Sequence, residues 1–228
     1  MEKIKLVKCA VTDVDGNIYD GVNVNGKLWM VSNLKTTKFN NGEIIGRCNK
    51  SKEGKLPYFE YPNSEYLNEF EFNNYGLYYN FAAVNTGKLA PIGWHVPSIK
   101  EWEELFFFIA QQYEYNLNIN NTDAFGSEIA KSLCSTDGWF KGLHNNDVGS
   151  KQQNNNFTGF NILPAGFWEC ASSGILCLGY YATFWSSSQK NKKENNVAWA
   201  VEAGHKRAYI NKCCCYTNTG YNVRCVMD

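Results

Sequence analysis

Asparagine sets the strongest limit on the fold of this sequence. The chain has 228 residues, and 29 of them are Asn. Many stand together, as in Asn40-Asn41, Asn145-Asn146 and Asn154-Asn155-Asn156. Asn tolerates left-handed backbone and hydrogen-bonds its own turn, so these clusters mark loops. We therefore expect many short elements joined by polar turns rather than a few long helices.

Strand signals occupy both ends of the chain. In residues 11–34 apolar positions recur with period two, and Asp15-Gly16 and Asn25-Gly26 are strong hairpin signals. This pattern predicts an antiparallel meander. From residue 157 onward, short apolar–polar runs return between Gly and Ser turns, and they predict a β-rich last third.

The part between residues 35 and 84 carries a weaker signal. Residues 35–74 are rich in Lys, Asn, Glu and Tyr, and we expect a long irregular connection with a short strand at residues 58–61. Residues 76–84 could form either a strand or a short helix, because their periodicity does not distinguish the two.

Two helices are expected. Ser98 and Glu101 form a capping box, and Trp102, Leu105, Phe106 and Ile109 follow at helical spacing. A second, shorter helix is expected from Asp123 to Leu133. Strands, then helices, then strands is the α+β order, with the helices packed on a mostly antiparallel sheet. No linker-like stretch divides the chain, so a single domain is expected.

Charge and hydropathy exclude several classes of function. Lys+Arg and Asp+Glu are 22 each, so no net field favours nucleic acid or an anionic membrane surface. The longest apolar run, residues 105–110, is far shorter than the ~20 residues that cross a bilayer. We therefore expect no nucleic-acid partner and no membrane span. The start of the chain also lacks the pattern of a secretory signal peptide.

The nine cysteines cannot all pair within one chain, so free thiols are expected. No Cys-x-x-Cys spacing occurs, and the three adjacent residues Cys213, Cys214 and Cys215 could not all reach one tetrahedral zinc ion. We expect neither a structural metal nor a regular disulfide framework.

Two further features are assigned structural roles. The run from Asp13 to Asn17 resembles half of a calcium loop, but its Gly stands at the fourth position and no Glu follows at the twelfth, which favours a turn. His95 lies between Trp94 and Val96, where we expect a packed residue bonded to nearby backbone rather than a catalytic group.

Six motifs stand in a familiar order along the chain. They are Thr12-Asp13-Val14-Asp15-Gly16-Asn17-Ile18-Tyr19, Trp29-Met30-Val31-Ser32-Asn33-Leu34-Lys35-Thr36-Thr37, Tyr75-Gly76-Leu77-Tyr78-Tyr79-Asn80-Phe81-Ala82-Ala83-Val84, Leu89-Ala90-Pro91-Ile92-Gly93-Trp94-His95-Val96-Pro97-Ser98, Phe184-Trp185-Ser186-Ser187-Ser188 and Val223-Arg224-Cys225-Val226. Together they resemble the Fibrobacter succinogenes major paralogous domain, a family of bacterial surface and secreted proteins common in Bacteroidetes.

The resemblance implies a fold similar to C-type lectins. In such folds the chain ends lie close together in one sheet, two helices flank it, and a loop-rich half carries ligand specificity. The resemblance brings no catalytic motif. It implies a domain over residues 11–228 after an N-terminal extension at residues 1–10. Trp29, Trp94, Trp102 and Trp185 are then expected as core residues. The chain lacks the calcium-binding strings of sugar-binding lectins.

Residues 186–222 are the unusual part of this pattern. Domains that resemble this one can be rewritten by diversity-generating retroelements, which change Asn codons into those of Tyr, Cys, Ser, Thr, His, Ala or Gly. The residue mixture here fits that list, and it predicts a variable ligand-binding segment. The alternative is ordinary strand and turn with some drifted cysteines. The expected ligand-binding residues are Glu202, His205, Arg207, Tyr209, Asn211, Cys213, Cys214, Cys215, Tyr216 and Asn218.

The function that we favour is a non-enzymatic binding module for a protein or glycan on a cell surface, acting as an adhesin or a phage receptor-binding protein. It needs no cofactor. The chain has no Gly-x-Ser-x-Gly motif, no Gly-rich phosphate loop and no two His residues at the spacing of a metal site. Two alternatives stay open: a structural surface or virion component, and a copper oxidase of the formylglycine-generating type. The oligomeric state is left open. The resemblance implies the cell surface, whereas nine cysteines without a signal peptide fit a phage particle or a reducing interior.

Overall fold

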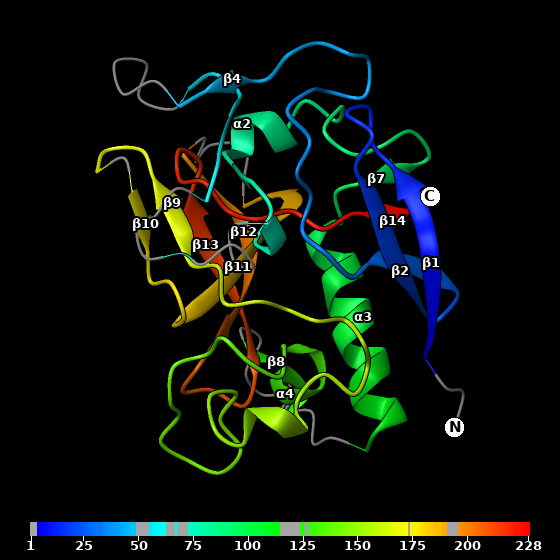
Figure 1. The fold of residues 1–228 in the computed structure, drawn as a ribbon, viewed down its shortest axis with the longest axis vertical. Helices are drawn as coiled ribbons and strands as arrows, with labels where there is room; N and C mark the ends of the chain where they lie inside the picture. The colour runs from blue at the N-terminus through cyan, green and yellow to red at the C-terminus, as the bar shows by residue number, and fades with distance from the viewer. Residues whose placement is uncertain are drawn as a thin grey trace.

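The computed structural model describes residues 4–48, 55–62, 67, 73–114, 124–125, 128–172, 174–190 and 196–228. Within them, a five-stranded sheet holds strands from both ends of the chain (Figure 1). In spatial order its strands are β1 (Lys5–Thr12), β2 (Ile18–Val24), β3 (Lys27–Met30), β14 (Val226–Met227) and β7 (Trp94–His95). The antiparallel pairs β1–β2 and β2–β3 confirm the predicted meander and its two turns. The first strand already begins at Lys5, inside the expected N-terminal extension.

A second sheet carries most of the C-terminal third. Its order is β11 (Tyr181–Gln189), β12 (Val197–Gly204), β13 (Ile210–Tyr216) and β8 (Ala124–Phe125), with each neighbouring pair antiparallel. The predicted β-rich last third is therefore confirmed.

Short strands pair in two further small sheets, one in and after the long connection and one in the segment before β11. The irregular connection contains β4 (Gly46–Arg47) and β5 (Tyr58–Glu60), which form one small sheet with β6 (Tyr78–Tyr79) from the segment that follows it. The strands β9 (Phe167–Glu169) and β10 (Gly174–Leu176) form a separate antiparallel pair. The short strand expected at residues 58–61 is thus confirmed, and residues 76–84 contain both a strand and a short helix.

The helices are α2 (Phe81–Val84), α3 (Ile99–Gln112) and α4 (Ile129–Leu133), together with the 3₁₀ turn η2 (Gln152–Asn154). The capping box of Ser98 and Glu101 is formed as predicted. The expectation of two helices was too low, because α2 is a third one within the described residues. The second helix was also placed too early: Ala124–Phe125 pairs with β13 as a strand, so the helix begins at Ile129.

Aromatic side chains fill the centre of the molecule. The rings of Trp29 and Trp102 lie 5.0 Å apart, and both also contact Phe160. Trp94 and Trp185 are buried too, so all four tryptophans expected in the core lie there. Helix α3 covers one face of the second sheet, where Trp102 contacts Phe184 of β11.

A buried cation joins the C-terminal segment to this core. The guanidinium of Arg224 is fully buried and donates hydrogen bonds to Asn33 Oδ1 at 3.0 Å and to the carbonyl oxygens of Phe160 and Asn161. It also lies over the rings of Phe160 and Phe184. Burial lowers its pKa to about 9. Arg224 therefore connects three separate parts of the chain.

Small antiparallel sheets with a few short helices make this an α+β protein. Among the residues that the structure describes, no helix is long and apolar enough to cross a bilayer.

Candidate binding surface on the second sheet

Strand β13 presents its side chains to two different environments. Its register with β12 places Asn211 opposite Glu202, Cys213 opposite Ala200, and Cys215 opposite Ala198. Directly opposite residues share a face of a sheet, because side chains alternate with period two. The odd-numbered residues of β13 therefore lie on the face of Glu202, and the even-numbered ones lie on the face toward α3.

The α3 side is occupied by packing and ion pairing. Ile210 is buried in the main core. Lys212 pairs with Glu103 of α3 at 2.9 Å, and its ammonium lies 5.0 Å from the centre of the Trp199 ring. Cys214 is on this side as well, but it is exposed. Cys214 consequently does not share a surface with Cys213 and Cys215, although all three were expected in one binding set.

The other side of the sheet is divided along its length. At the end near α2, Trp185, Ala198 and Ala200 are buried, and Phe81 of α2 contacts Trp185 at a ring distance of 5.3 Å. At the opposite end the residues stay half-buried or exposed, except for Thr183, which is buried beneath Glu202. We call this end the open face and define it by Tyr181, Thr183, Glu202, Arg207, Tyr209 and Asn211.

An ion pair forms the centre of the open face. Arg207 Nη1 donates to Glu202 Oε1 at 2.7 Å, and both side chains keep about a quarter of their surface exposed, at 27% and 22%. The guanidinium lies 5.4 Å from the centre of the Tyr181 ring and 6.0 Å from that of Tyr209. The Oγ1 atom of Thr183 lies 3.4 Å from the second oxygen of Glu202. The result is a charged pair flanked by two aromatic rings, with Tyr181 and Glu202 on strands β11 and β12 and Arg207 and Tyr209 in the turn between β12 and β13.

His205 does not belong to this surface. Its side chain is buried, with an exposed fraction of 6%, and its ring packs edge-on against Tyr180. Burial lowers the pKa of its imidazole. The prediction of an exposed contact residue was therefore wrong at His205: the residue follows the end of β12 and is covered by the loop over residues 138–150.

That loop is held against the β12–β13 turn by close backbone contacts. Gly149 donates its N–H to the carbonyl of His205 at 2.8 Å, and Val148 donates to that of Arg207. A Cβ at position 149 would lie 2.0 Å from the carbonyl oxygen of Phe140, so only Gly permits this approach. The same loop brings the exposed ring of Phe140 to 4.3 Å from that of Tyr180. Sequence reasoning missed this aromatic pair, because Phe140 lies in a loop without periodicity.

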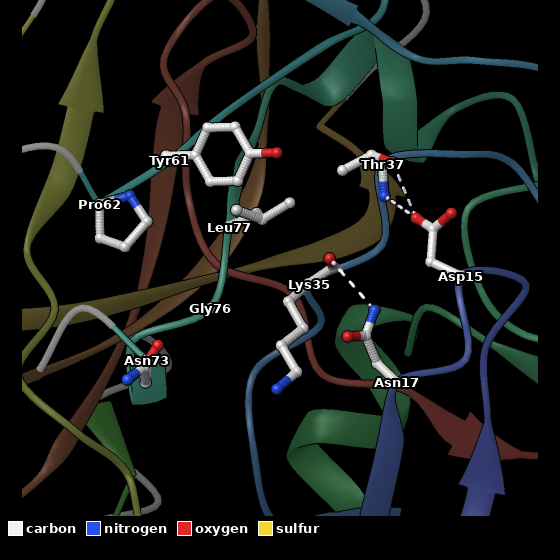
Figure 2. A pocket seen from close by; sticks show the side chains of 9 residues that line it. All are labelled: Asp15, Asn17, Lys35, Thr37, Tyr61, Pro62, Asn73, Gly76 and Leu77. Carbon is white, nitrogen blue, oxygen red and sulfur yellow. Dashed lines mark hydrogen bonds between the residues drawn. The ribbon is translucent and has the colours of Figure 1, made fainter. Parts of the chain in front are cut away.

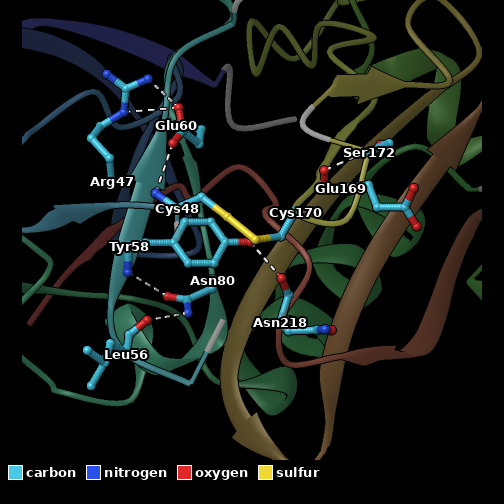
Figure 3. Close-up of a disulfide and its surroundings, with 10 residues drawn as sticks. All are labelled: Arg47, Cys48, Leu56, Tyr58, Glu60, Asn80, Glu169, Cys170, Ser172 and Asn218. Atoms are coloured by element: carbon cyan, nitrogen blue, oxygen red, sulfur yellow. Dashed lines mark hydrogen bonds and ion pairs between the residues drawn. A yellow bond between two sulfur atoms is a disulfide. The ribbon is translucent and has the colours of Figure 1, made fainter. Parts of the chain in front are cut away.

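Tyr216 and Asn218 lie at another place. Together with Glu169, Cys170, Ala171 and Thr219 they line a hollow of about 310 Å³. Beside it, Cys48 and Cys170 form a disulfide, and the Tyr58 hydroxyl donates to the carbonyl oxygen of Asn218 at 2.6 Å (Figure 3). Nine of the ten expected residues thus separate into the open face, a pair of thiols beside it, the α3 side and this hollow, and the tenth, His205, is buried.

A second hollow of about 310 Å³ lies between the first β-turn and the long connection. Figure 2 shows Asp15 and Asn17 on one side of it and Tyr61 and Pro62 on the other. Its carboxylate, Asp15, accepts from Thr37 and pairs with Lys38. In the turn itself, Asp13 accepts from three groups of Asp15 and Asn17. The turn predicted for this segment is confirmed. Within the described residues, no group of three or more His, Cys, Asp or Glu side chains could hold a metal ion.

His95 is engaged by carboxylates rather than by backbone, which corrects the expectation for it. Its Nε2 lies 2.9 Å from Glu101, and its Nδ1 lies 2.5 Å from Asp228. Lys27 pairs with the same Glu101 carboxylate at 3.0 Å. Glu101 therefore links the helix start to the five-stranded sheet.

The fold is α+β, and the chain carries a surface of aromatic and charged side chains on a sheet. The model of the Fibrobacter succinogenes major domain matches residues 22–227, so the chain belongs to that family. No curated protein and no solved structure matches the chain.

Proposed function

We propose that this protein is a non-enzymatic ligand-binding module and that the open face is its binding surface. The observation that carries the proposal is the Glu202–Arg207 pair between Tyr181 and Tyr209. Arg and Tyr are enriched among residues that dominate binding energy. Tyr181 and Glu202 lie on the paired strands β11 and β12, and a backbone hydrogen bond from Val148 holds the turn that carries Arg207, so little conformational entropy is lost on binding.

The ligand that we propose is a protein or glycan with acidic groups on a cell surface. Residues 186–228 contain seven Lys and Arg against three Asp and Glu. One of the seven, Arg224, is buried in the core. The remaining excess favours acidic partners over basic ones, although salt screens it at distances beyond about 10 Å. The stacked rings of Phe140 and Tyr180 extend the surface with a flat apolar area, which suits a sugar ring or an aromatic side chain equally.

We further propose that the frame is C-type-lectin-like. Two features support this proposal: strands from both ends of the chain lie in one sheet, and the second sheet presents the open face. On this fold, residues 186–222 are the segment that a diversity-generating retroelement would rewrite. An adjacent reverse-transcriptase gene, with a near-copy of the 3′ end that has Asn codons at the variable positions, would test the diversification.

A selection experiment tests the binding surface. Peptides from a phage-displayed library and glycans on an array are selected on the native chain. Their affinity is then measured for the variant Glu202→Gln/Arg207→Gln/Tyr209→Ser/Asn211→Ser. We expect at least a tenfold loss. The matched control is Ile44→Ser/Ile92→Ser, whose side chains are 76% and 83% exposed elsewhere, and it should bind as the native chain does. Ligands that bind the fourfold variant as tightly as they bind the native chain would contradict the proposal.

The alternative of an assembly component predicts a different result. Light scattering would then show a stable oligomer at micromolar concentration, and the fourfold variant would dissociate it. If the native chain and the fourfold variant are both monomeric, the result favours ligand display over assembly.

A further inference from the structure

We propose that Cys213 and Cys215 form a chelating dithiol site for a trivalent arsenical or a similarly thiophilic centre. The two sulfur atoms lie 3.5 Å apart on one strand, and both side chains are half-buried. The inference is independent of the proposed ligand-display function, because it requires only these two thiols.

The geometry suits a shared centre. Two thiolates with bonds of about 2.3 Å to one atom, as in zinc–thiolate sites, lie about 3.5–3.8 Å apart when the angle between the bonds is about 100–110°. The observed separation is at the lower end of that range. It fits a three-coordinate pyramidal atom, whose bond angles are smaller than tetrahedral ones. Among the described residues, no carboxylate, imidazole or further thiol joins the two thiols as a third ligand for a larger metal site.

The strand holds the two thiols together. Cys213 and Cys215 are two positions apart on β13, and they face Ala200 and Ala198 of β12. Both Ala residues are buried in the core cluster against which the two cysteines pack, and the β12–β13 ladder prevents the cysteines from moving apart. The Sγ atom of Cys213 also lies 3.6 Å from the carbonyl oxygen of Ala200 on the neighbouring strand. The site is therefore formed before any ligand arrives.

The surroundings favour one thiolate in the pair. The hydrogen bond from Cys213 lowers the pKa of the Cys215 thiol, burial opposes this shift, and a hydrogen bond from Tyr221 adds to it. The pKa of Cys213 is raised by the same hydrogen bond and by burial. Cys215 is thus the thiol that attacks first, and Cys213 closes the ring.

The reaction with phenylarsine oxide is balanced and involves no oxidation. Two sulfur–arsenic bonds form, the arsenic–oxygen bond breaks, and the oxygen leaves as water with the two thiol protons. The phenyl–arsenic bond stays intact. A dithiol ring of this kind resists competition by a monothiol, whereas a small dithiol removes the arsenic.

Phenylarsine oxide and intact-protein mass spectrometry provide the test. The full chain is reduced, freed of reductant and mixed with one equivalent of the reagent. We expect one phenylarsenic adduct that survives millimolar 2-mercaptoethanol and is removed by 2,3-dimercaptopropanol. Cys213→Ser and Cys215→Ser should each lower the adduct at least tenfold. The matched control is Cys214→Ser, which removes the adjacent thiol on the opposite side of the strand and should leave the adduct unchanged.

The reduced disulfide could itself bind the reagent, so a second measurement separates the two pairs. The same variants are repeated in a Cys48→Ser/Cys170→Ser background, and the adduct is located by peptide mapping in the native chain. An adduct on Cys213 and Cys215 in the map supports the inference. No adduct, an adduct on Cys48 and Cys170 only, or equal loss in Cys214→Ser would overturn it.

Discussion

At the residue scale, we expect Arg224 to make a large contribution to the free energy of unfolding. It is fully buried and supplies hydrogen bonds to acceptors from two distant segments. Arg224→Met should leave those acceptors buried without donors and lower the free energy of unfolding by about 3 kcal/mol or more. Urea denaturation measures the change.

The matched control for Arg224→Met is Arg207→Met, because Arg207 is part of a half-exposed ion pair. Its loss should cost less than about 1 kcal/mol. Equal losses for the two variants would show that Arg224 does not hold the core together.

Glu101 should make stability depend on acid pH. Burial raises the pKa of its carboxyl, but hydrogen bonds from Ser98, Lys27 and His95 outweigh burial and lower the pKa to about 2. A carboxyl with a lowered folded-state pKa stabilises the fold above its unfolded value, near 4.5, and loses that contribution as the pH falls toward 2. After allowance for solvent screening we expect about 1–2 kcal/mol.

The measurement is the free energy of unfolding between pH 5 and pH 2 for the native chain and for Glu101→Gln. The native chain should lose more stability over this range than the variant. Glu43→Gln, on an exposed turn, is the control and should follow the native curve. Parallel curves for the native chain and Glu101→Gln would refute the role of this carboxyl.

Individual residues show where sequence reasoning succeeded. The capping box at Ser98 and the tryptophan core were predictable, because both depend on local spacing and on hydrophobicity. His205 was misplaced, because its burial comes from a loop some 60 residues earlier in the chain that closes over it. His95 was misplaced for a similar reason: its partner Asp228 lies 133 residues away.

At the scale of elements, core packing and surface chemistry divide at the start of β13, because Tyr209 is in the turn before the strand and Ile210 is its first residue. Ile210 is buried against the core, whereas Tyr209 is 37% exposed on the open face. Ile210→Ala should therefore cost about 2–4 kcal/mol. Tyr209→Ala should cost about 0.5 kcal/mol or less. Chemical denaturation of both variants tests this difference between the buried and the exposed residue. A larger loss of unfolding free energy for Tyr209→Ala than for Ile210→Ala would contradict it.

The same strand explains why the candidate site was only partly predictable. The sequence indicated a strand in the last third and an unusual residue mixture, but it left open which residues share a face. That assignment needed the register of β13 on β12, which separates Cys214 from Cys213 and Cys215. Likewise, the helical spacing before Leu133 concealed strand β8, whose pairing with β13 overrides local propensity.

At the scale of the whole molecule, the disulfide ties the long connection to the segment before β11. It closes a loop of 122 residues between Cys48 and Cys170. Replacing both cysteines by Ser should lower the free energy of unfolding by about 2–4 kcal/mol, because the unfolded chain gains freedom. The control Cys177→Ser, at an exposed thiol, should change it by less than about 0.5 kcal/mol. Equal stability of the double variant and the native chain would show that the bridge adds nothing.

The central claim also belongs to this scale: an aromatic-filled frame carries a face whose chemistry can change without loss of the fold. The most direct test is the thermal unfolding midpoint of Glu202→Gln/Arg207→Gln/Tyr209→Ser/Asn211→Ser against that of the native chain. Because 1 kcal/mol shifts the midpoint of a chain of this size by about 2–4 °C, we predict a drop of no more than about 4 °C. A drop of more than about 12 °C would mean that these side chains hold the fold together, and it would contradict the claim.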